Sequence, residues 1–412
     1  MTDIDDEAPA GGSARAALTH RDFRIVFAGS FVSNIGRWMQ NVVLTAFAWE
    51  LTERPSFVSL VVFAQLGPML LLSIVGGTLA DSLDRRRLLL ATQVWQAAWT
   101  FVLAAAVLGD DIAEWLLVVL VFIIGLGQAI FAPTWSAVLP TIAGRENLAA
   151  AISLNSTQMN ASRVVGPALG GVLWVATDAS TVFVVNGVSY VFVIGALLAA
   201  AIPAVERPAT GSGWERITAG IRVVRRRPRI RNSLLLMAMF AFWCLPFIGQ
   251  MPTLAELNLG IDAKSGSYGV LYATFGSGAV IGALLIGTLL LHTPKPRVVR
   301  GTLLLFSAAL AVLALMRDPL PAFPVIFVVG MSYFATTTAL MTHVQGHIED
   351  EIRGRVMALW TMAFGGMVPL SNLIAGPLIE RTSVTAVVLG GAVAALVLAL
   401  TIDLEPMSTP PR

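Results

Sequence analysis

The sequence predicts an all-α membrane protein whose twelve transmembrane helices form two parallel, pseudo-symmetric halves of six. Of its 412 residues, 56% are hydrophobic and 13% are charged, whereas a soluble domain carries about 25% charged residues. The apolar residues form twelve runs, each close to the roughly 20 residues that cross a bilayer as a helix. Landmarks of the first six runs recur in the last six at a constant offset of 210 residues. Long apolar runs, low charge and an internal repeat together predict this fold class.

The twelve predicted spans are separated by short polar loops. They cover residues 23–51, 57–80, 88–108, 115–139, 148–176, 181–202, 233–255, 268–291, 301–316, 323–345, 355–379 and 384–402. The predicted organisation is a cytoplasmic tail of residues 1–22, a six-helix half of residues 23–202, a cytoplasmic linker of residues 203–232, a second six-helix half of residues 233–402 and a cytoplasmic tail of residues 403–412.

The distribution of Lys and Arg predicts the orientation. Loops on one side of the spans hold 21 of the 27 basic residues, and loops on the other side hold four, namely Arg54, Lys264, Arg317 and Arg381. We call these sides the basic end and the opposite end. Because Lys and Arg are retained in cytoplasmic loops, we expect a multi-pass protein of the inner (cytoplasmic) membrane with both termini in the cytoplasm.

The linker has the pattern of a basic amphipathic helix. Trp214, Ile217, Ile221 and Val224 recur at intervals of three and four residues, with arginines between them. Such a helix is suited to lie on an anionic inner leaflet. A linker helix without a lipid role shows the same pattern, so both interpretations stay open.

The internal repeat is seen at four separate landmarks. The matching positions are Gly77-Thr78-Leu79 with Gly287-Thr288-Leu289, Arg85 with Lys295, Gly144-Arg145 with Gly354-Arg355, and Gly166-Pro167 with Gly376-Pro377. Parallel repeats of this kind are typical of transporters that hold their substrate path between two halves. Asp81 has no counterpart, because Leu291 stands at the matching position. Any role of Asp81 is therefore confined to the first half.

Several motifs resemble one transporter family. The charged loop from Gly77 to Arg87 resembles the loop between helices two and three of the major facilitator superfamily. Gly36-Arg37-Trp38-Met39-Gln40, Ala64-Gln65-Leu66-Gly67-Pro68 and the segment from Arg163 to Gly171 resemble its drug–proton antiporters, the subgroup that includes macrolide efflux pumps and the enterobactin exporter. The sequence departs from the antiporters between Val118 and Gln128, where their fourth span commonly carries an Arg.

The resemblance implies a secondary active transporter that works by alternating access. The expected activity is proton-coupled efflux of an amphiphilic small molecule, such as a drug, a macrolide or a siderophore-like compound. An importer or facilitator of a small organic solute is one alternative, and a non-transporting receptor or scaffold is another. We expect a monomer that contacts membrane lipid, a small-molecule substrate and protons. No enzyme motif, catalytic residue, metal site, cofactor or nucleic-acid partner is expected.

Two arginines lie deep in predicted spans and mark the expected substrate site. Arg37 is 13 residues beyond Arg24, and Arg163 is 15 residues into span five. A charge at that depth is costly and by default marks a functional site. The polar residues within one or two turns complete the expected site: Gln40, Asn41, Asn155 and Gln158. The alternative is structural, with an arginine paired to Glu50 or to backbone carbonyls.

The resemblance also implies a gate at the basic end. We expect Asp81 to dock on the start of span eleven near Gly354-Arg355, where a helix N-terminus carries partial positive charge, and Arg85 to pair with Glu146. The expected gating residues are Gly77, Asp81, Arg85, Arg86, Glu146 and Arg355. The alternative is that these charges only mark topology.

Two Gly-Pro pairs are candidate hinges. Gly166-Pro167 lies in span five and Gly376-Pro377 in span eleven. Proline removes a backbone donor and glycine permits close approach of helices, so such a pair allows a helix to bend. Static kinks are the alternative interpretation.

Overall fold

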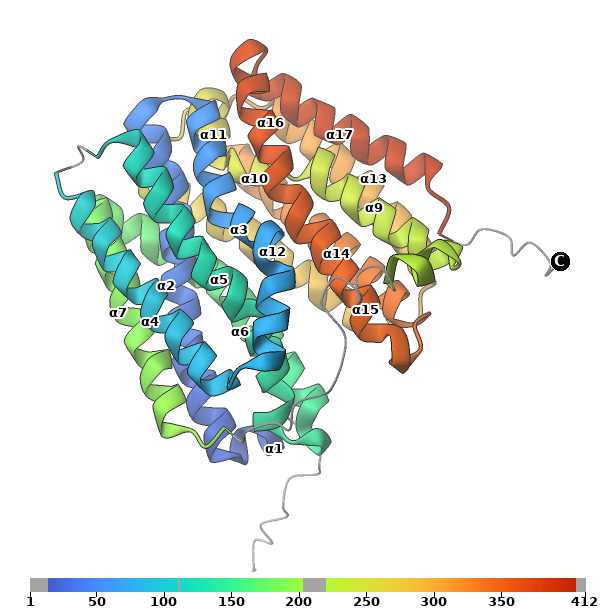
Figure 1. Ribbon diagram of the computed structural model, residues 1–412. Helices are drawn as coiled ribbons and strands as arrows, with labels where there is room; N and C mark the ends of the chain where they lie inside the picture. Colours follow the sequence, from blue (N-terminus) through green and yellow to red (C-terminus); the bar gives the residue numbers. More distant parts are fainter. Residues whose placement is uncertain (1–13, 110–111, 203–219, 405–412) are drawn as a thin grey trace, which may run out of the picture.

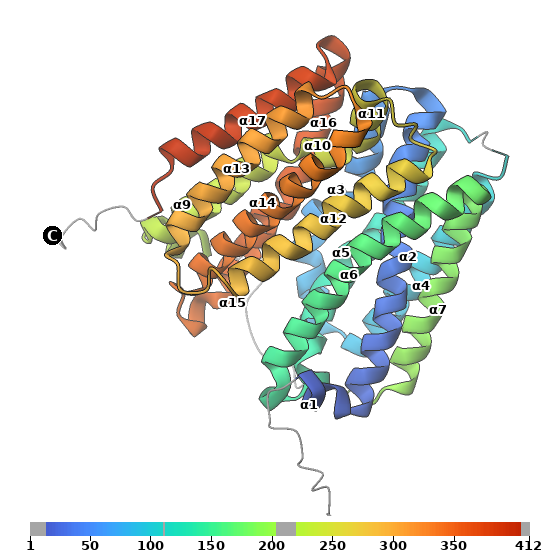
Figure 2. The ribbon, with the colours of Figure 1, turned by 180° about the vertical axis from the view of Figure 1, so that it is seen from behind.

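The structure, a computed structural model, describes residues 14–109, 112–202 and 220–404 and shows two helical bundles side by side (Figures 1 and 2). The first bundle contains α1 (Ala14–Thr19), α2 (Arg21–Thr52), α3 (Pro55–Ser82), α4 (Arg85–Ala106), α5 (Glu114–Ala143), the 3-10 turn η1 (Arg145–Asn147), α6 (Leu148–Ala176) and α7 (Ala179–Ala199). The second contains α9 (Pro228–Cys244), α10 (Pro246–Gly249), α11 (Met251–Leu259), α12 (Gly266–Gly287), α13 (Lys295–Leu315), α14 (Pro319–Gln345), α15 (Asp350–Thr361), the π-helix η2 (Met362–Gly366), α16 (Met367–Arg381) and α17 (Val384–Thr401).

Polar caps fix where several helices begin. The Asp84 carboxylate accepts a hydrogen bond from the Arg87 backbone N–H at 2.8 Å and opens α4. The Asp178 carboxylate caps α7 in the same way at 2.6 Å. Such side chains satisfy backbone donors that a helix start leaves without partners. The starts of α4 and α13, Arg85 and Lys295, keep the offset of 210 predicted from the sequence.

Two spans are broken where the sequence predicts continuous helices. Span seven is divided into α9, α10 and α11, and Pro246 and Pro252 follow the two breaks because proline cannot donate a helical hydrogen bond. Span eleven begins at Asp350, earlier than the expected Gly354-Arg355, and η2 interrupts it. A single π-helical turn inserts an extra residue into the hydrogen-bond ladder.

Within the described residues, eight helices are long and apolar enough to cross a membrane: α4, α5, α7, α12, α13, α14, the span formed by α15 to α16, and α17. Helices α2 and α6 are not among them. These two carry the polar residues of the expected substrate site, including Arg37 and Arg163. Helices α3 and α9 are also outside this set, so hydropathy alone does not single out the helices where function is expected.

The two bundles meet at the opposite end and diverge toward α1 and α15 at the basic end (Figures 1 and 2). The Trp49 indole N–H donates to Glu256 at 2.8 Å, and the Gln250 amide donates to the Ser59 hydroxyl at 2.7 Å. One apolar core joins both bundles there, whereas the basic end of the first bundle has a separate core around Phe23. The structure is therefore closed at the opposite end.

Glycines permit the close approach of the bundles. A Cβ placed on Gly171 of α6 would lie 2.9 Å from the Cα of Gly269 on α12. A Cβ on Gly376 of α16 would lie 2.5 Å from the Pro55 carbonyl oxygen at the start of α3. Distances this short leave no space for a side chain, so the closed end depends on small residues, as is typical of tightly packed membrane helices.

Most of the predicted amphipathic linker helix lies outside the described residues. Its final turn, residues 220–225, is helical. A Cβ on Gly220 would lie 3.2 Å from the Arg355 carbonyl oxygen, so this turn packs against α15.

Candidate functional site

A polar cavity of about 180 Å³ lies within the first bundle. Its walls come from α2, α4, α5, α6 and α7. The polar and aromatic lining residues are Ser30, Ser33, Asn34, Arg37, Gln93, Gln128, Phe131, Trp135, Ser136, Asn155 and Tyr190. The cavity therefore combines one cation with several uncharged donors and acceptors.

Arg37 is the charged residue of this cavity. Its Nη1 donates to the Gln128 side-chain oxygen at 2.9 Å, and its Nη2 donates to the Asn34 side-chain oxygen. Among the lining residues that the structure describes, no carboxylate neutralises the guanidinium. The positive charge is held in place by dipoles alone, and an anion is the ligand that such a site favours.

Glu50 does not pair with Arg37, which removes that structural alternative. It lies 13 residues further along α2, a rise of about 20 Å. At the opposite end its carboxylate forms a cluster with Glu256 and Asp262, whose ligand oxygens lie within 4.8 Å of one another.

Asn155 is the second expected site residue that lines the cavity. Its side-chain oxygen accepts hydrogen bonds from the Trp135 indole N–H at 3.2 Å and from the Gln158 amide at 3.1 Å. Gln158 is buried behind it on α6. The pair therefore fixes the orientation of the Asn155 amide and of the Trp135 ring.

Gln40 and Asn41 face other helices instead of the cavity. The Gln40 side-chain oxygen accepts a hydrogen bond from the Asn186 amide of α7 at 2.7 Å, and both residues are buried. The Asn41 oxygen accepts from the Gln65 amide of α3 at 2.7 Å. Both residues thus link α2 to a neighbouring helix, although they lie within about one turn of Arg37.

Arg163 lies where the two bundles meet. Its guanidinium carbon is 5.3 Å from the centre of the Trp38 ring and 4.5 Å from that of Phe334, which belongs to α14 of the second bundle. Both distances fall in the range of cation–π attraction. Its Nη1 donates to Asn160 at 3.4 Å, and its buried Nε has no hydrogen-bond partner among the described residues. This arginine therefore retains donor capacity.

The second bundle faces Arg163 with aromatic rings. Phe334 packs edge-on against Tyr333 with ring centres 4.6 Å apart. Tyr333 stacks on Phe275 at 6.0 Å, and Phe275 contacts Phe247 at 5.9 Å. We call these four residues the aromatic wall. Phe247, Phe275 and Tyr333 are buried, so Phe334 is the ring of this group that is partly exposed and suits the apolar part of a ligand.

Comparison with known proteins identifies the family. The family model for transmembrane secretion effectors matches residues 12–408. The chain belongs to this family of major facilitator transporters. The predictions of a multi-pass membrane transporter with this fold are thereby confirmed.

The transporter is similar to several curated relatives. It is 25% identical to the staphyloferrin A transporter of Staphylococcus aureus, over 84% of this chain and 87% of that protein. It is 24% identical to macrolide efflux protein A of Streptococcus pyogenes (88% and 90%) and 26% identical to the enterobactin exporter of Escherichia coli (83% and 82%). The resemblance to the macrolide and enterobactin pumps is confirmed.

Solved structures share the fold of the transporter. A mutant form of the nucleoside transporter NupG superposes with a TM-score of 0.77 at 11% identity over 93% of this chain and 99% of that chain. A bacterial homologue of the human lysosomal transporter Spinster, described as inward-facing and unoccupied, gives a TM-score of 0.70 at 14% identity over 92% and 94%.

Two of the expected gating arginines bind backbone carbonyls of helices in their own bundle. The transporter's Arg85 donates to the Ala137 carbonyl of α5 at 3.3 Å. Arg86 donates to the Leu197 and Leu198 carbonyls of α7 at 3.0 and 2.6 Å. Arg86 therefore lies at the C-terminus of α7, where a cation is stabilised by the unpaired carbonyls. These contacts link the start of α4 to α5 and α7.

Four further residues were predicted to act in the gate. Glu146 and Arg355 are exposed at the basic end. The expectations for Gly77 and Asp81 lie outside the side chains that the structure describes. The docking of Asp81 on span eleven therefore stays a prediction.

Both candidate hinges lie inside continuous helices of the transporter. Helix α6 runs through Gly166-Pro167, and α16 runs through Gly376-Pro377. A Cβ on Gly166 would lie 2.5 Å from the Trp38 Cβ, so this glycine brings α6 against α2 beside the two arginines. The hinge role also stays a prediction.

The sequence analysis missed several lining residues, above all Asn34, Gln93, Gln128, Trp135 and Tyr190. Two of them had a usable signal. Asn34 precedes Arg37 by three residues, which places it on the same helix face. Gln128 is a polar side chain in the otherwise apolar stretch where the antiporters carry an Arg.

Proposed function

We propose that this transporter exports an amphiphilic small molecule bearing carboxylate, phenolate or similar acceptor groups, by alternating access between its two halves. The observation that carries the proposal is Arg37, whose guanidinium faces a polar cavity with amide partners and no carboxylate in the described lining. An anion that binds there exchanges its surrounding water for the planar set of N–H donors of the guanidinium.

The two bundles divide the recognition of the substrate between them. Arg37, with Gln93 and Asn155, supplies polar contacts from the first half. Arg163 has an unused donor at the junction of the halves, and Phe334, the partly exposed ring of the aromatic wall, accepts the apolar part. An amphiphile is the ligand that fits such a division.

The relatives support this direction and substrate class. Two carry siderophore names, the staphyloferrin A transporter and the enterobactin exporter, and a third is a macrolide efflux protein. A chelator of ferric iron presents anionic oxygen atoms, to which Arg37 can donate hydrogen bonds. A drug with a protonated amine would be repelled by the same guanidinium. The proposal therefore favours a siderophore-like cargo over a cationic drug.

The proposed cycle requires an orientation. With the basic end and both termini in the cytoplasm, closure at the opposite end corresponds to the inward-facing state. Asp81 then forms a latch at the basic end when the opposite end opens, and the glycine-proline pairs absorb the bending. Inward proton flow is the proposed driving force.

Cysteine labelling tests the orientation. In a background without the buried Cys244, a cysteine at exposed Leu291 should react only from the cytoplasm, and one at exposed Ser267 only from outside. Reversed labelling contradicts the proposed direction of access.

Transport into inverted membrane vesicles tests the function. With an imposed proton gradient, enterobactin or staphyloferrin A should accumulate faster than erythromycin, and Arg37→Gln should abolish the difference. Arg24→Gln is the matched control, because Arg24 is an exposed arginine of the same helix. Accumulation of erythromycin alone, or transport by Arg37→Gln at the parental rate, contradicts the proposal.

A further inference from the structure

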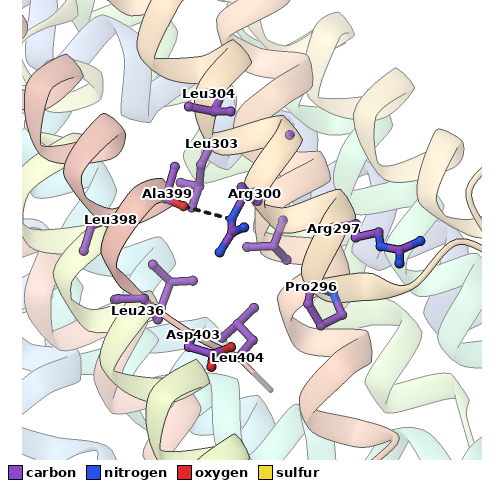
Figure 3. A pocket seen from close by; sticks show the side chains of 13 residues that line it. Leu236, Pro296, Arg297, Arg300, Leu303, Leu304, Leu398, Ala399, Asp403 and Leu404 are labelled. Atoms are coloured by element: carbon purple, nitrogen blue, oxygen red, sulfur yellow. Dashed lines mark hydrogen bonds between the residues drawn. The ribbon is translucent and has the colours of Figure 1, made fainter. Parts of the chain in front are cut away.

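A second hollow lies far from the transport cavity, on the flank of the second bundle (Figure 3). It is a groove of about 420 Å³ between α9, α13 and α17 near the basic end. Its lining residues are Leu236, Pro296, Arg297, Val299, Arg300, Gly301, Leu303, Leu304, Leu398, Ala399, Ile402, Asp403 and Leu404. None of them lines the polar cavity around Arg37.

The groove has an apolar floor. Leu236, Leu303 and Leu398 are buried side chains that come from the three different helices. On the surrounding surface, Leu235, Leu304 and Leu400 are exposed in positions where a membrane protein meets lipid. A leucine-lined slot that opens toward lipid has the size and chemistry for an acyl chain.

Arg300 supplies a fixed cation at the mouth of this slot. Its Nε donates to the Ala399 carbonyl of α17 at 3.1 Å, and Figure 3 shows the side chain reaching from α13 into the groove. That hydrogen bond leaves the terminal nitrogens for a ligand and sets the direction of the guanidinium. Arg297 lies one turn earlier on α13, at the rim.

The net charge of the lining is positive. Asp403 contributes one negative charge and is engaged in an interaction of its own, whereas Arg297 and Arg300 contribute two positive charges. The groove also lies at the end of the protein that is rich in arginine. Basic pockets between helices on the cytoplasmic side are suited to anionic lipid head groups.

We propose that this groove binds an anionic phospholipid, with its phosphate on Arg300 and one acyl chain along Leu236, Leu303 and Leu398. The combination decides between possible ligands, because a soluble phosphate leaves the apolar floor uncovered and an uncharged lipid leaves Arg300 without a counter-charge. The bound lipid contacts α9, α13 and α17 together and so ties the outer helices of the second half to one another.

Native mass spectrometry tests this site directly. The transporter is reconstituted in nanodiscs of equal parts phosphatidylglycerol and phosphatidylcholine, and the lipids that remain bound after release are counted. The parental protein should retain phosphatidylglycerol, and Arg300→Gln should retain about tenfold less, the factor expected when a charge-assisted hydrogen bond is lost. Arg24→Gln, an exposed arginine at the same end, should match the parental protein.

A second variant fills the groove without removing charge. A Cβ on Gly301 meets nothing within 4 Å, so Gly301→Leu should place its side chain in the groove and leave the helix intact, since leucine favours helix more than glycine does. It should also lose the retained lipid. Added phosphatidylglycerol should raise the melting temperature of the delipidated parental protein but not of either variant.

Three results overturn the proposal. One is equal retention of phosphatidylglycerol by the parental protein and both variants. Another is equal retention of phosphatidylcholine, which makes the site indifferent to charge. The third is full displacement of the lipid by glycerol phosphate, which identifies a site for a soluble phosphate.

Discussion

The two halves share a plan of helices but differ in the chemistry of their interiors. At the offset of 210, Arg37 of the first half corresponds to Phe247 of the second, and Arg163 corresponds to Leu373. Phe247 is buried against aromatic rings. Arg37, in contrast, donates hydrogen bonds to amide side chains beside a cavity. Gln40 and its counterpart Gln250 are both kept, and both make hydrogen bonds between helices.

This difference separates what the fold needs from what the substrate needs. Positions that brace helices, such as Gln40 and Gln250, are polar in both halves. The two arginines of the proposed substrate site have apolar counterparts, Phe247 and Leu373, so the first half holds the charge in this proposal. The predictions below test that division, from the largest expected effect to the smallest.

The largest effect is expected for Arg37. Arg37→Gln should lower transport of an acidic substrate about 10- to 100-fold, because a hydrogen bond to a charged group contributes about 1.5–3 kcal/mol. Arg37→Lys should lose less, since it keeps the charge but cannot donate to Gln128 and Asn34 in the same geometry. Initial rates in inverted vesicles measure both, with Arg24→Gln as control. Equal loss in the two variants would assign the effect to geometry alone.

The second effect concerns the one-sided loop. Asp81→Asn should lower transport roughly tenfold without lowering the amount of protein, because it removes the charge that the proposed latch requires at a helix N-terminus. The matched control is Leu291→Asn at the corresponding position of the second half, which should transport normally. Normal transport by Asp81→Asn reduces this residue to a marker of topology.

The third effect concerns the contact between the halves at Arg163. Phe334→Leu keeps an apolar side chain but removes the ring 4.5 Å from the guanidinium. Loss of about 0.5–1 kcal/mol of cation–π attraction should weaken substrate binding about two- to fivefold. Phe327→Leu on the same helix is the control for lost ring volume. Equal weakening in both variants shows that the effect is packing and not the Arg163 contact.

The smallest effect concerns closure at the opposite end. Glu256→Gln keeps an acceptor for the Trp49 indole but removes one of three clustered carboxylates. Relief of repulsion between partly exposed charges, at most about 1 kcal/mol, should favour the closed opposite end by up to about fivefold. Spin labels at exposed Trp115 and Leu320, one in each half, report the change as a larger short-distance population. A shift toward longer distances contradicts this account of closure.

The sequence predicted what depends on hydropathy and on the internal repeat. The bounds of α6 agree with the predicted span, and the depth of Arg37 follows from its distance to Arg24 along one helix. Hydropathy could not predict the breaks in spans seven and eleven, because backbone geometry there is set by proline and by an inserted turn. Hydropathy reports how apolar a segment is, but it does not report the pattern of backbone hydrogen bonds in that segment.

The direction in which each polar side chain faces could not be predicted. Arg37 and Gln40 are three residues apart on α2, yet one bonds to α5 and the other to α7. The rotation of a helix among its neighbours decides such partners. The contact of Arg163 with Phe334 likewise joins residues 171 positions apart, which no local pattern reports.

The central claim is that Arg37 makes the cavity selective for acidic substrates, and binding to the purified protein tests it most directly. Dissociation constants for enterobactin, staphyloferrin A and erythromycin are measured by isothermal titration calorimetry for the parental protein and Arg37→Gln. The account predicts that at least one siderophore binds the parental protein about tenfold or more tightly than erythromycin, the factor for one charge-assisted hydrogen bond, and that the preference vanishes in Arg37→Gln. Tighter binding of erythromycin by the parental protein, or a preference that survives the substitution, contradicts the claim.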